Sequence, residues 1–129
     1  MVGLKPTYGR VSRAGAMALS WSMDHLGPLA WTARDVALML QVMAGPDPAD
    51  ATASRRAVPD YLSGIDRGIT GLRVGLPENY FFEGAAEEMV AGVRQAARQL
   101  EDLGARVSEI RLPDPRHMTD VAMLIARAE

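Results

Sequence analysis

The chain of 129 residues contains no cysteine and only two histidines. The lack of cysteine excludes a disulfide framework, a thiolate zinc site and a cysteine nucleophile. The histidines, His25 and His117, stand far apart with no pattern of metal-ligating residues around them. We therefore expect no metal site and no cofactor, and we expect both histidines to be packed or solvated side chains.

The sequence also lacks long apolar runs and any excess of charge. No apolar stretch reaches the ~18 residues that a membrane span requires, and the start of the chain lacks the apolar segment of a signal peptide. Lys and Arg number 14 against 16 Asp and Glu, which leaves a net charge of -2 and no basic block to neutralise phosphates. We expect a cytoplasmic protein with neither a membrane nor a nucleic acid as partner.

Local signs of catalysis are missing as well. The segment after the apolar run at 72–76 has no Gly-x-Gly-x-x-Gly pattern, which argues against a nucleotide site. The acidic pairs Glu87-Glu88 and Glu101-Asp102 fall on the polar side or at the end of an amphipathic helix, where carboxylates are solvated. Three serines near the only lysine stand outside any Gly-x-Ser-x-Gly context and are expected to bond locally in turns: Ser12, Ser20 and Ser22.

What the sequence does contain is 48% hydrophobic residues, enough for one domain or a piece of one. Residues 1–31 are broken by glycine and proline and predict irregular chain with two short strands. A helix is expected over 33–44, with Thr32 as N-cap and Asp35 completing a capping box. Its apolar residues point in nearly every direction, so the helix must be covered on all sides. Residues 46–59 predict a surface loop, followed by a short helical turn at Tyr61 and Leu62.

The second half predicts a strand–helix–strand unit over about 72–112. Its parts are a strand at 72–76, a helix at 85–103 that ends at Gly104, and a strand at 107–112 with one bulge. Strand, helix and strand in this order imply a right-handed parallel crossover. A further helix is expected at 117–128, and the whole pattern indicates an α/β fold.

Several motifs resemble the amidase signature family of amide hydrolases, in the family's order and spacing along the whole chain. The resemblance implies that residues 1–129 form a partial amidase domain, with a mixed β-sheet covered by helices. The motifs are Gly3-Leu4-Lys5-Pro6-Thr7-Tyr8-Gly9-Arg10-Val11-Ser12-Arg13, Ser22-Met23-Asp24-His25-Leu26-Gly27-Pro28, Gly45-x-Asp47-x-x-Asp50-x-Thr52 and Ile125-Ala126-x-x-Glu129.

The resemblance also implies where the catalytic groups belong. The family uses a serine nucleophile, a second serine in a cis peptide and a lysine base, and all three lie upstream of the motif that begins at Gly3. Lys5 belongs to the later Gly-Leu-Lys-Pro-Thr motif, so no catalytic residue is carried over to this chain. We expect an internal fragment or truncated product of an amidase that cleaves a small-molecule amide through an acyl-serine intermediate, inactive by itself.

Three alternatives stay open. The chain could be a small noncatalytic α/β binding or subunit module, a noncatalytic paralogue that associates with a complete amidase, or part of the glutamine-hydrolysing A subunit of a tRNA-dependent amidotransferase. Ala122 and Met123 stand where those A subunits carry a pair of tyrosines, which favours a general amidase acting on a less polar amide. Apolar surface on the helix 33–44 also predicts marginal stability or self-association.

Overall fold

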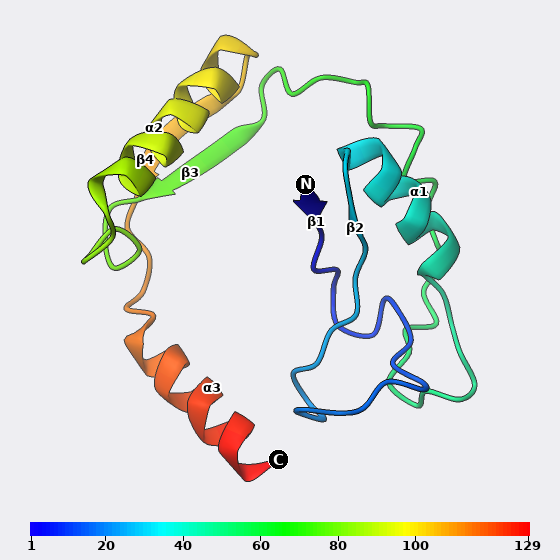
Figure 1. Cartoon of the computed structure of the whole chain (residues 1–129). Coiled ribbons are helices and arrows are strands. Elements are labelled where there is room, and N and C mark those ends of the chain that lie inside the picture. The colour runs from blue at the N-terminus through cyan, green and yellow to red at the C-terminus, as the bar shows by residue number, and fades with distance from the viewer. The chain divides into compact units, whose positions relative to one another are not determined.

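The computed structural model describes all residues from Met1 to Glu129 and divides into two compact units. The first unit comprises Met1–Asp66 together with Leu124–Glu129, and the second comprises Arg67–Met123. Both units contain helices and strands, which confirms the α/β class (Figure 1).

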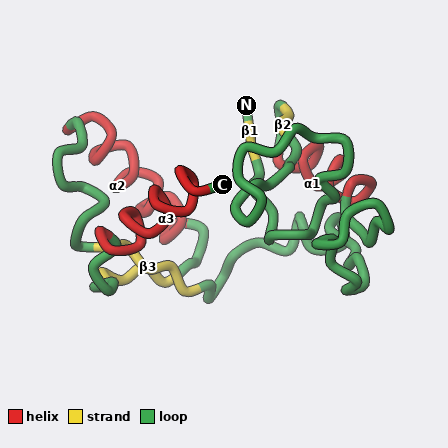
Figure 2. The backbone as a smooth tube through the Cα atoms, turned by 90° about the horizontal axis from the view of Figure 1, so that it is seen from below, coloured by secondary structure: helices red, strands yellow, loops and turns green.

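The first unit is mostly loop, with one small antiparallel sheet (Figure 2). Strand β1, Val2–Gly3, pairs with strand β2, Leu29–Ala30. Leu4 continues this pairing, because its backbone N–H donates to the carbonyl of Pro28 at 3.0 Å. The two short strands expected within residues 1–31 are therefore confirmed.

Helix α1 spans Ala33–Met43 and has the predicted N-terminus. The Thr32 hydroxyl oxygen accepts from the backbone N–H of Asp35 at 3.1 Å and donates to that residue's carboxylate at 2.7 Å. The first bond satisfies a helix-end N–H that has no partner inside the helix, whereas the Asp35 carboxylate accepts from the Thr32 hydroxyl and not, as in the expected capping box, from the Thr32 backbone N–H. The helix ends one residue earlier than expected, because Ala44 is extended and acts as C-cap.

Helix α1 is buried on one side only. Val36 and Leu40, one turn apart, are buried, and the helix contacts β1 and β2. Val42, on another side, is 87% exposed. The chain thus covers only part of a helix whose composition calls for cover on every side.

The loop of residues 46–59 lies at the surface as expected, since none of its residues is buried, and it is also bound to the body of the first unit. The Arg10 guanidinium donates to the carbonyls of Arg56 and Ala57 at 3.1 and 3.2 Å, and Ser54 N–H donates to the Gly9 carbonyl at 2.7 Å. Composition alone cannot reveal such long-range bonds, since polar loop residues look the same whether free or tethered.

The expectation of a short helical turn at Tyr61 and Leu62 is wrong. Both residues lie in a bend, where the backbone N–H of Tyr61 donates to the side chain of Gln41 and that of Leu62 donates to Asp60. These side-chain acceptors compete with helical hydrogen bonding.

The second unit contains the predicted strand–helix–strand arrangement. Strand β3, Arg73–Pro77, runs parallel to strand β4, Arg106–Ile110, and helix α2, Glu87–Asp102, connects them. Gly104 follows α2 with φ +92°, the left-handed conformation expected of a glycine that ends a helix. Helix α3, Arg116–Ala128, follows β4 close to its expected range.

The bulge expected in the last strand is absent, because β3 and β4 pair one to one and β4 ends at Ile110. Leu112 lies beyond the strand, where its backbone exchanges two hydrogen bonds with the amide side chain of Asn79, at 3.1 and 3.2 Å. That side chain takes the place of a strand partner. Each sheet has two strands, one sheet antiparallel and the other parallel.

None of the helices combines the length and the apolar character needed to span a membrane.

Candidate functional site

The Gly3–Arg13 motif enters a tight turn at Gly9. This glycine has φ +73°, and a Cβ there would collide with the carbonyl oxygen of Thr52. Only glycine tolerates both the conformation and the close approach. The loop that carries Thr52 therefore lies directly against the turn, and two stretches about 40 residues apart in the sequence meet.

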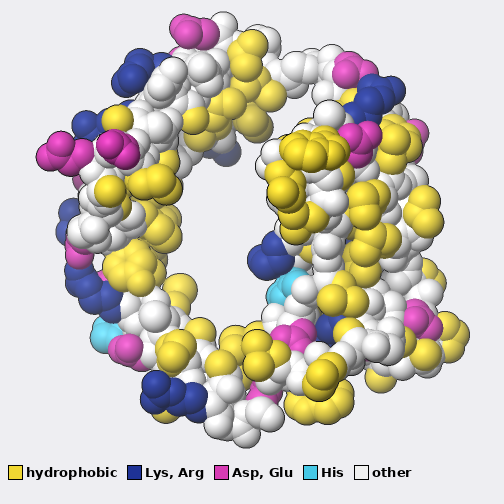
Figure 3. All heavy atoms as spheres, viewed as in Figure 1, with side chains coloured by type: hydrophobic (Ala, Val, Ile, Leu, Met, Phe, Trp, Pro, Cys, Tyr) yellow, Lys and Arg dark blue, Asp and Glu magenta, His cyan; other side chains and the backbone are white.

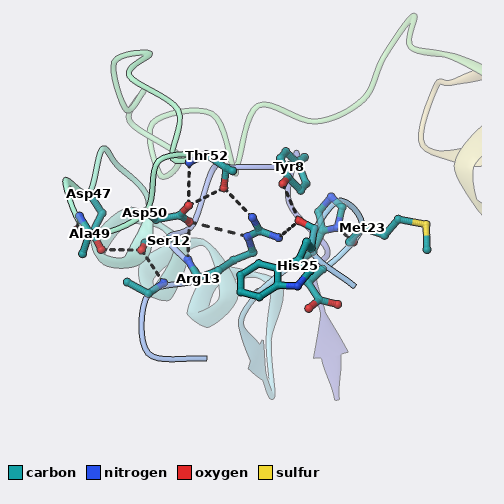
Figure 4. Close-up of polar contacts among 12 residues, drawn as sticks. Tyr8, Ser12, Arg13, Met23, His25, Asp47, Ala49, Asp50 and Thr52 are labelled. Carbon is teal, nitrogen blue, oxygen red and sulfur yellow. Dashed lines mark hydrogen bonds and ion pairs between the residues drawn. The ribbon is translucent and has the colours of Figure 1, made fainter. Parts of the chain in front are cut away.

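Arg13 is the centre of the resulting polar cluster (Figure 4). Its guanidinium donates to the Trp21 carbonyl oxygen at 2.6 Å and to the Thr52 hydroxyl at 2.9 Å. Its Cζ lies 4.9 Å from the centroid of the Tyr8 ring, a cation–π distance. Tyr8 in turn donates its hydroxyl to the Trp21 carbonyl at 3.1 Å. The Arg13 side chain thus contacts three separate segments of the chain, at Tyr8, Trp21 and Thr52.

Asp50 completes the cluster as the negative partner of Arg13. Its carboxylate accepts from the Arg13 backbone N–H at 2.8 Å and from the Thr52 hydroxyl and backbone N–H at 2.6 and 2.8 Å, and it lies 3.9 Å from Arg13 Nε. The bond from the Thr52 hydroxyl, followed by those from the two backbone N–H groups, lowers the pKa of Asp50 from 3.8 to about 2. The carboxylate is therefore ionised at neutral pH, and it accepts three hydrogen bonds.

A second carboxylate holds Ser12. The Ser12 hydroxyl donates to Asp47 at 2.6 Å and accepts from the backbone N–H of Ala14 at 3.1 Å. The Ser12 bond and then the backbone bond from Ala49 lower the pKa of Asp47. The expected local turn bond of Ser12 is present, and a long-range bond to the loop accompanies it.

Ser20 and Ser22 both bind Glu129. The buried Ser20 hydroxyl donates to the Glu129 carboxylate at 2.5 Å, and the Ser22 backbone N–H donates to the same oxygen at 3.1 Å. The bond from Ser20 contributes most to lowering the pKa of Glu129. Within the first unit this carboxylate ties the end of α3 to the turn at residues 20–22.

Of the remaining residues considered from the sequence, only His25 touches the Arg13 cluster, through the ring of Tyr8. Lys5 Nζ donates to the carbonyl of Pro6 at 3.4 Å and makes no bond to Ser12, Ser20 or Ser22. His25 is packed, with Nδ1 at 2.6 Å from the Met23 carbonyl and its ring edge-on to Tyr8 at 5.5 Å. His117, Glu87, Glu88, Glu101 and Asp102 are exposed. No group of three or more metal-ligating side chains occurs.

A pocket of about 600 Å³ lies beside the Arg13 cluster within the first unit. Its lining includes Arg13 and Asp50, whose charges already face one another. The apolar part of the lining includes Met17, Leu19 and Trp21, all largely exposed to solvent. The lining also includes Asp24, so the pocket is an open depression with both apolar and charged walls.

The family model for amidases matches residues 1–129, the whole chain, and the chain belongs to the amidase family. The amidase resemblance of the sequence motifs is thereby confirmed.

Relatives of two kinds match the chain. It is 49% identical over 129 residues to the glutamyl-tRNA(Gln) amidotransferase A subunit of Marinobacter nauticus, covering all of this chain and 27% of that one. It is 52% identical over 113 residues to an amidase of Pseudomonas putida, covering 87% of this chain and 24% of that protein.

A solved structure shows the same fold. The crystal structure of the glutamyl-tRNA(Gln) amidotransferase A subunit from Thermotoga maritima matches with a TM-score of 0.86 and 38% identity, over 96% of this chain and 27% of that chain. The chain thus spans about a quarter of the length of the relatives that it matches.

Sequence reasoning identified the motifs of this cluster and missed how they connect. The bonds from Arg13 to Asp50 and Thr52 and from Ser12 to Asp47 were not predicted, and neither was the bond between Ser20 and Glu129. The available signal was chemical complementarity: one motif carries Arg13 and the other carries two carboxylates at a spacing of three residues.

Proposed function

We propose that the complete protein to which this segment belongs hydrolyses the C–N bond of a small carboxamide through an acyl-serine intermediate, and that this chain contributes scaffold. The observation that carries the proposal is the family match over all 129 residues. The Arg13 cluster supports it, because this cluster fixes the segment that follows the nucleophile in the family. We further propose a cytoplasmic location and no nucleic-acid or membrane partner.

The serines of this chain are poor nucleophiles for a physical reason. A serine attacks an amide only when a base near neutral pKa takes its proton. The acceptors of Ser12 and Ser20 are Asp47 and Glu129, and hydrogen bonds lower the pKa of both carboxyl groups below their ordinary values. Such weak bases leave the hydroxyls protonated, so we propose that the chain contains no catalytic residue.

The first experiment assays the purified chain with a panel of aliphatic and aromatic amides, beside the variants Ser12→Ala, Ser20→Ala and Ser22→Ala. We expect no turnover above background. Turnover that one serine substitution abolishes while the others retain it would show a nucleophile in this chain and overturn its assignment as scaffold.

The second experiment uses the full reading frame, obtained by sequencing the DNA upstream of Met1 and translating it in frame. We expect an upstream serine- and glycine-rich segment, and hydrolysis that yields a hydroxamate when hydroxylamine is added, since hydroxylamine captures an acyl-enzyme. Amide hydrolysis without hydroxamate would argue against the covalent intermediate. A frame with no such segment would favour the small noncatalytic module.

For the substrate, we propose a less polar amide in preference to glutamine. Ala122 and Met123 lie on α3 at the positions where the resemblance places two tyrosines of glutamine-using subunits, and neither side chain can donate the hydrogen bond of a phenol.

A second candidate is the A subunit of a glutamyl-tRNA(Gln) amidotransferase. The observation in its favour is that relatives with this name match all 129 residues, at 45% identity in Ligilactobacillus salivarius and 49% in Marinobacter nauticus. Comparing kcat/KM for free glutamine with that for an aromatic amide separates the two candidates. A clear preference for glutamine would reject the less polar substrate.

A further inference from the structure

Within the second unit, the start of helix α3 is held by polar contacts and not by a buried apolar side. No residue of α3 is buried, and none of the main packing contacts between helices and strands involves this helix. Side chains of both charges gather where α3 begins on the face drawn in Figure 3. The hydrogen bonds and ion pairs made there therefore have a large share in fixing the start of the helix.

These bonds centre on Arg116, in the first turn of α3. Its guanidinium donates to the Glu83 carboxylate at 2.6 Å and to the Asp114 carboxylate at 2.8 Å. Its Cζ also lies 6.0 Å from the centroid of the Tyr80 ring, a cation–π distance. The bond from the Arg116 side chain contributes most to lowering the pKa of Glu83, and the bond from its backbone N–H contributes most to lowering the pKa of Asp114. Both carboxylates are therefore ionised at neutral pH.

A second contact reaches α3 one turn further along. The Tyr80 and Thr119 hydroxyl oxygens lie 3.1 Å apart, and the Thr119 hydroxyl donates to the Pro115 carbonyl at 3.3 Å, which leaves Tyr80 as the donor between the two. We call the whole set the Arg116 cluster. Its members are Tyr80, Glu83, Asp114, Arg116 and Thr119.

Tyr80 takes part in this cluster with a strained backbone. It has φ +69° and is the one residue other than glycine with a positive φ. A bulky side chain adopts this conformation rarely and at an energetic cost. The Tyr80 N–H donates to one oxygen of the Glu83 carboxylate at 3.0 Å, while the other oxygen binds Arg116. A single carboxylate thus links the strained residue to the guanidinium, and strain retained in this way is typical of functional positions.

The cluster contacts the side of α3 that carries Met123. Arg116, Thr119 and Met123 stand three and four positions apart, which places them along one side of the helix, and Ala122 follows Thr119 by three positions. We propose that Arg116 is a positioning residue, which acts through Glu83 and Tyr80 to fix Ala122 and Met123 and thereby the choice between a less polar amide and glutamine. This inference rests on the proposed function, which assigns substrate choice to those two positions.

The first test measures hydrogen exchange of the chain without substrate. The side chains of Arg116 and Glu83 are 56% and 57% exposed, so salt screens their ion pair. We expect the amides of residues 119–123 to exchange about three- to fivefold faster in ~1 M than in ~0.05 M NaCl. Arg116→Gln should exchange at the faster rate at both salt concentrations.

The matched control is Arg127→Gln. Arg127 lies on the same helix and forms no ion pair, so its replacement should leave both the exchange rates at 119–123 and their dependence on salt unchanged. Tyr80→Phe, which removes only the hydroxyl, should speed exchange less than Arg116→Gln. Circular dichroism of each variant checks that the helices remain formed.

The second test uses the full reading frame and compares kcat/KM for an aromatic amide with that for glutamine. We expect Arg116→Gln to change the ratio of the two values at least about threefold, and Arg127→Gln to leave it unchanged. Arg116→Lys keeps the charge and loses the two-pronged donor, so it should give an intermediate ratio. High salt should shift the ratio of the unsubstituted protein in the same direction as Arg116→Gln does.

Two outcomes would overturn the proposal. In the first, the amides of 119–123 exchange equally fast with and without the Arg116→Gln substitution. In the second, the substitution speeds exchange and leaves the ratio of the kcat/KM values unchanged, which would make the cluster a surface contact with no part in substrate choice. A complete protein that hydrolyses neither amide would contradict the proposed function and this inference with it. The hydrogen-exchange result, which needs no substrate, separately decides whether the cluster holds α3.

Discussion

Replacing Leu40 by alanine is expected to destabilise the first unit far more than the same change two residues further along α1. Leu40 is 6% exposed, whereas Val42 is 87% exposed. Leu40→Ala removes roughly three buried carbon groups at about 0.8 kcal/mol each, and the cavity left behind brings the expected loss to about 2–5 kcal/mol. Since so few hydrophobic side chains are buried, this loss is a large fraction of the total stability.

Val42→Ala removes no buried contact, and alanine has the higher helix propensity, so the expected change is a few tenths of a kcal/mol in the stabilising direction. The assay is urea unfolding followed by tryptophan fluorescence. Trp21 and Trp31 both lie in the first unit, and because both are largely exposed, far-UV circular dichroism is recorded alongside their fluorescence.

Comparable losses for Leu40→Ala and Val42→Ala in a monomer would refute the reasoning, because α1 would then be buried on both sides within the chain. Sedimentation at the protein concentration of the unfolding experiment is the control. If the chain self-associates there, the comparison is repeated at dilutions where it is monomeric.

Three further predictions concern individual contacts. The folded-state pKa of Asp50, about 2, lies below its ordinary value of 3.8, so the ionised carboxylate stabilises the fold above pH ~4 and this stabilisation is lost as the pH falls toward 2. Asp50→Asn should therefore reduce the change of the urea unfolding midpoint with pH between pH 5 and 2.5. Gly104→Ala should lower the free energy of unfolding by about 1–2 kcal/mol, because residue 104 has φ +92° and an added Cβ would lie against Thr70. Gly92→Ala, within α2, should raise it by about 0.5–1 kcal/mol, and thermal unfolding measures both changes. Ser20→Ala should speed hydrogen exchange at residues 125–129 and leave the exchange of β3 and β4 unchanged; unaltered exchange at 125–129 would argue against the Ser20–Glu129 contact as an anchor.

Local signals in the sequence predicted most of the elements. Thr32 indicates the start of α1 because the hydroxyl of an N-cap residue bonds the backbone N–H three residues further on, whatever the rest of the chain does. Gly104 predicts the end of α2 for a similar local reason, its left-handed backbone conformation. The strand–helix–strand order then sufficed to predict the parallel pairing of β3 with β4.

Sequence reasoning failed to predict hydrogen bonds whose two partners are far apart in the sequence. The loop 46–59 lies at the surface as expected, but its bonds to Arg10 and Gly9, which span more than 40 residues, were not predicted. The last strand was expected to continue to Leu112, yet the side chain of Asn79 takes over its backbone hydrogen bonds. No pattern within a short window contains the partner in either case.

By itself, the sequence determined the class of fold, the positions of the helices and strands and membership of the amidase family, because each rests on local periodicity, capping or the order of motifs. Only the tertiary structure decided how Arg13, Asp50 and Thr52 come together, and that Ser20 binds Glu129 across 109 positions. The tertiary structure alone also showed which side of α1 is buried, because the sequence of a helix that is apolar nearly all round does not indicate which side packs against a neighbour. Contacts between distant segments depend on the path of the folded chain, and that path is a property of the whole molecule.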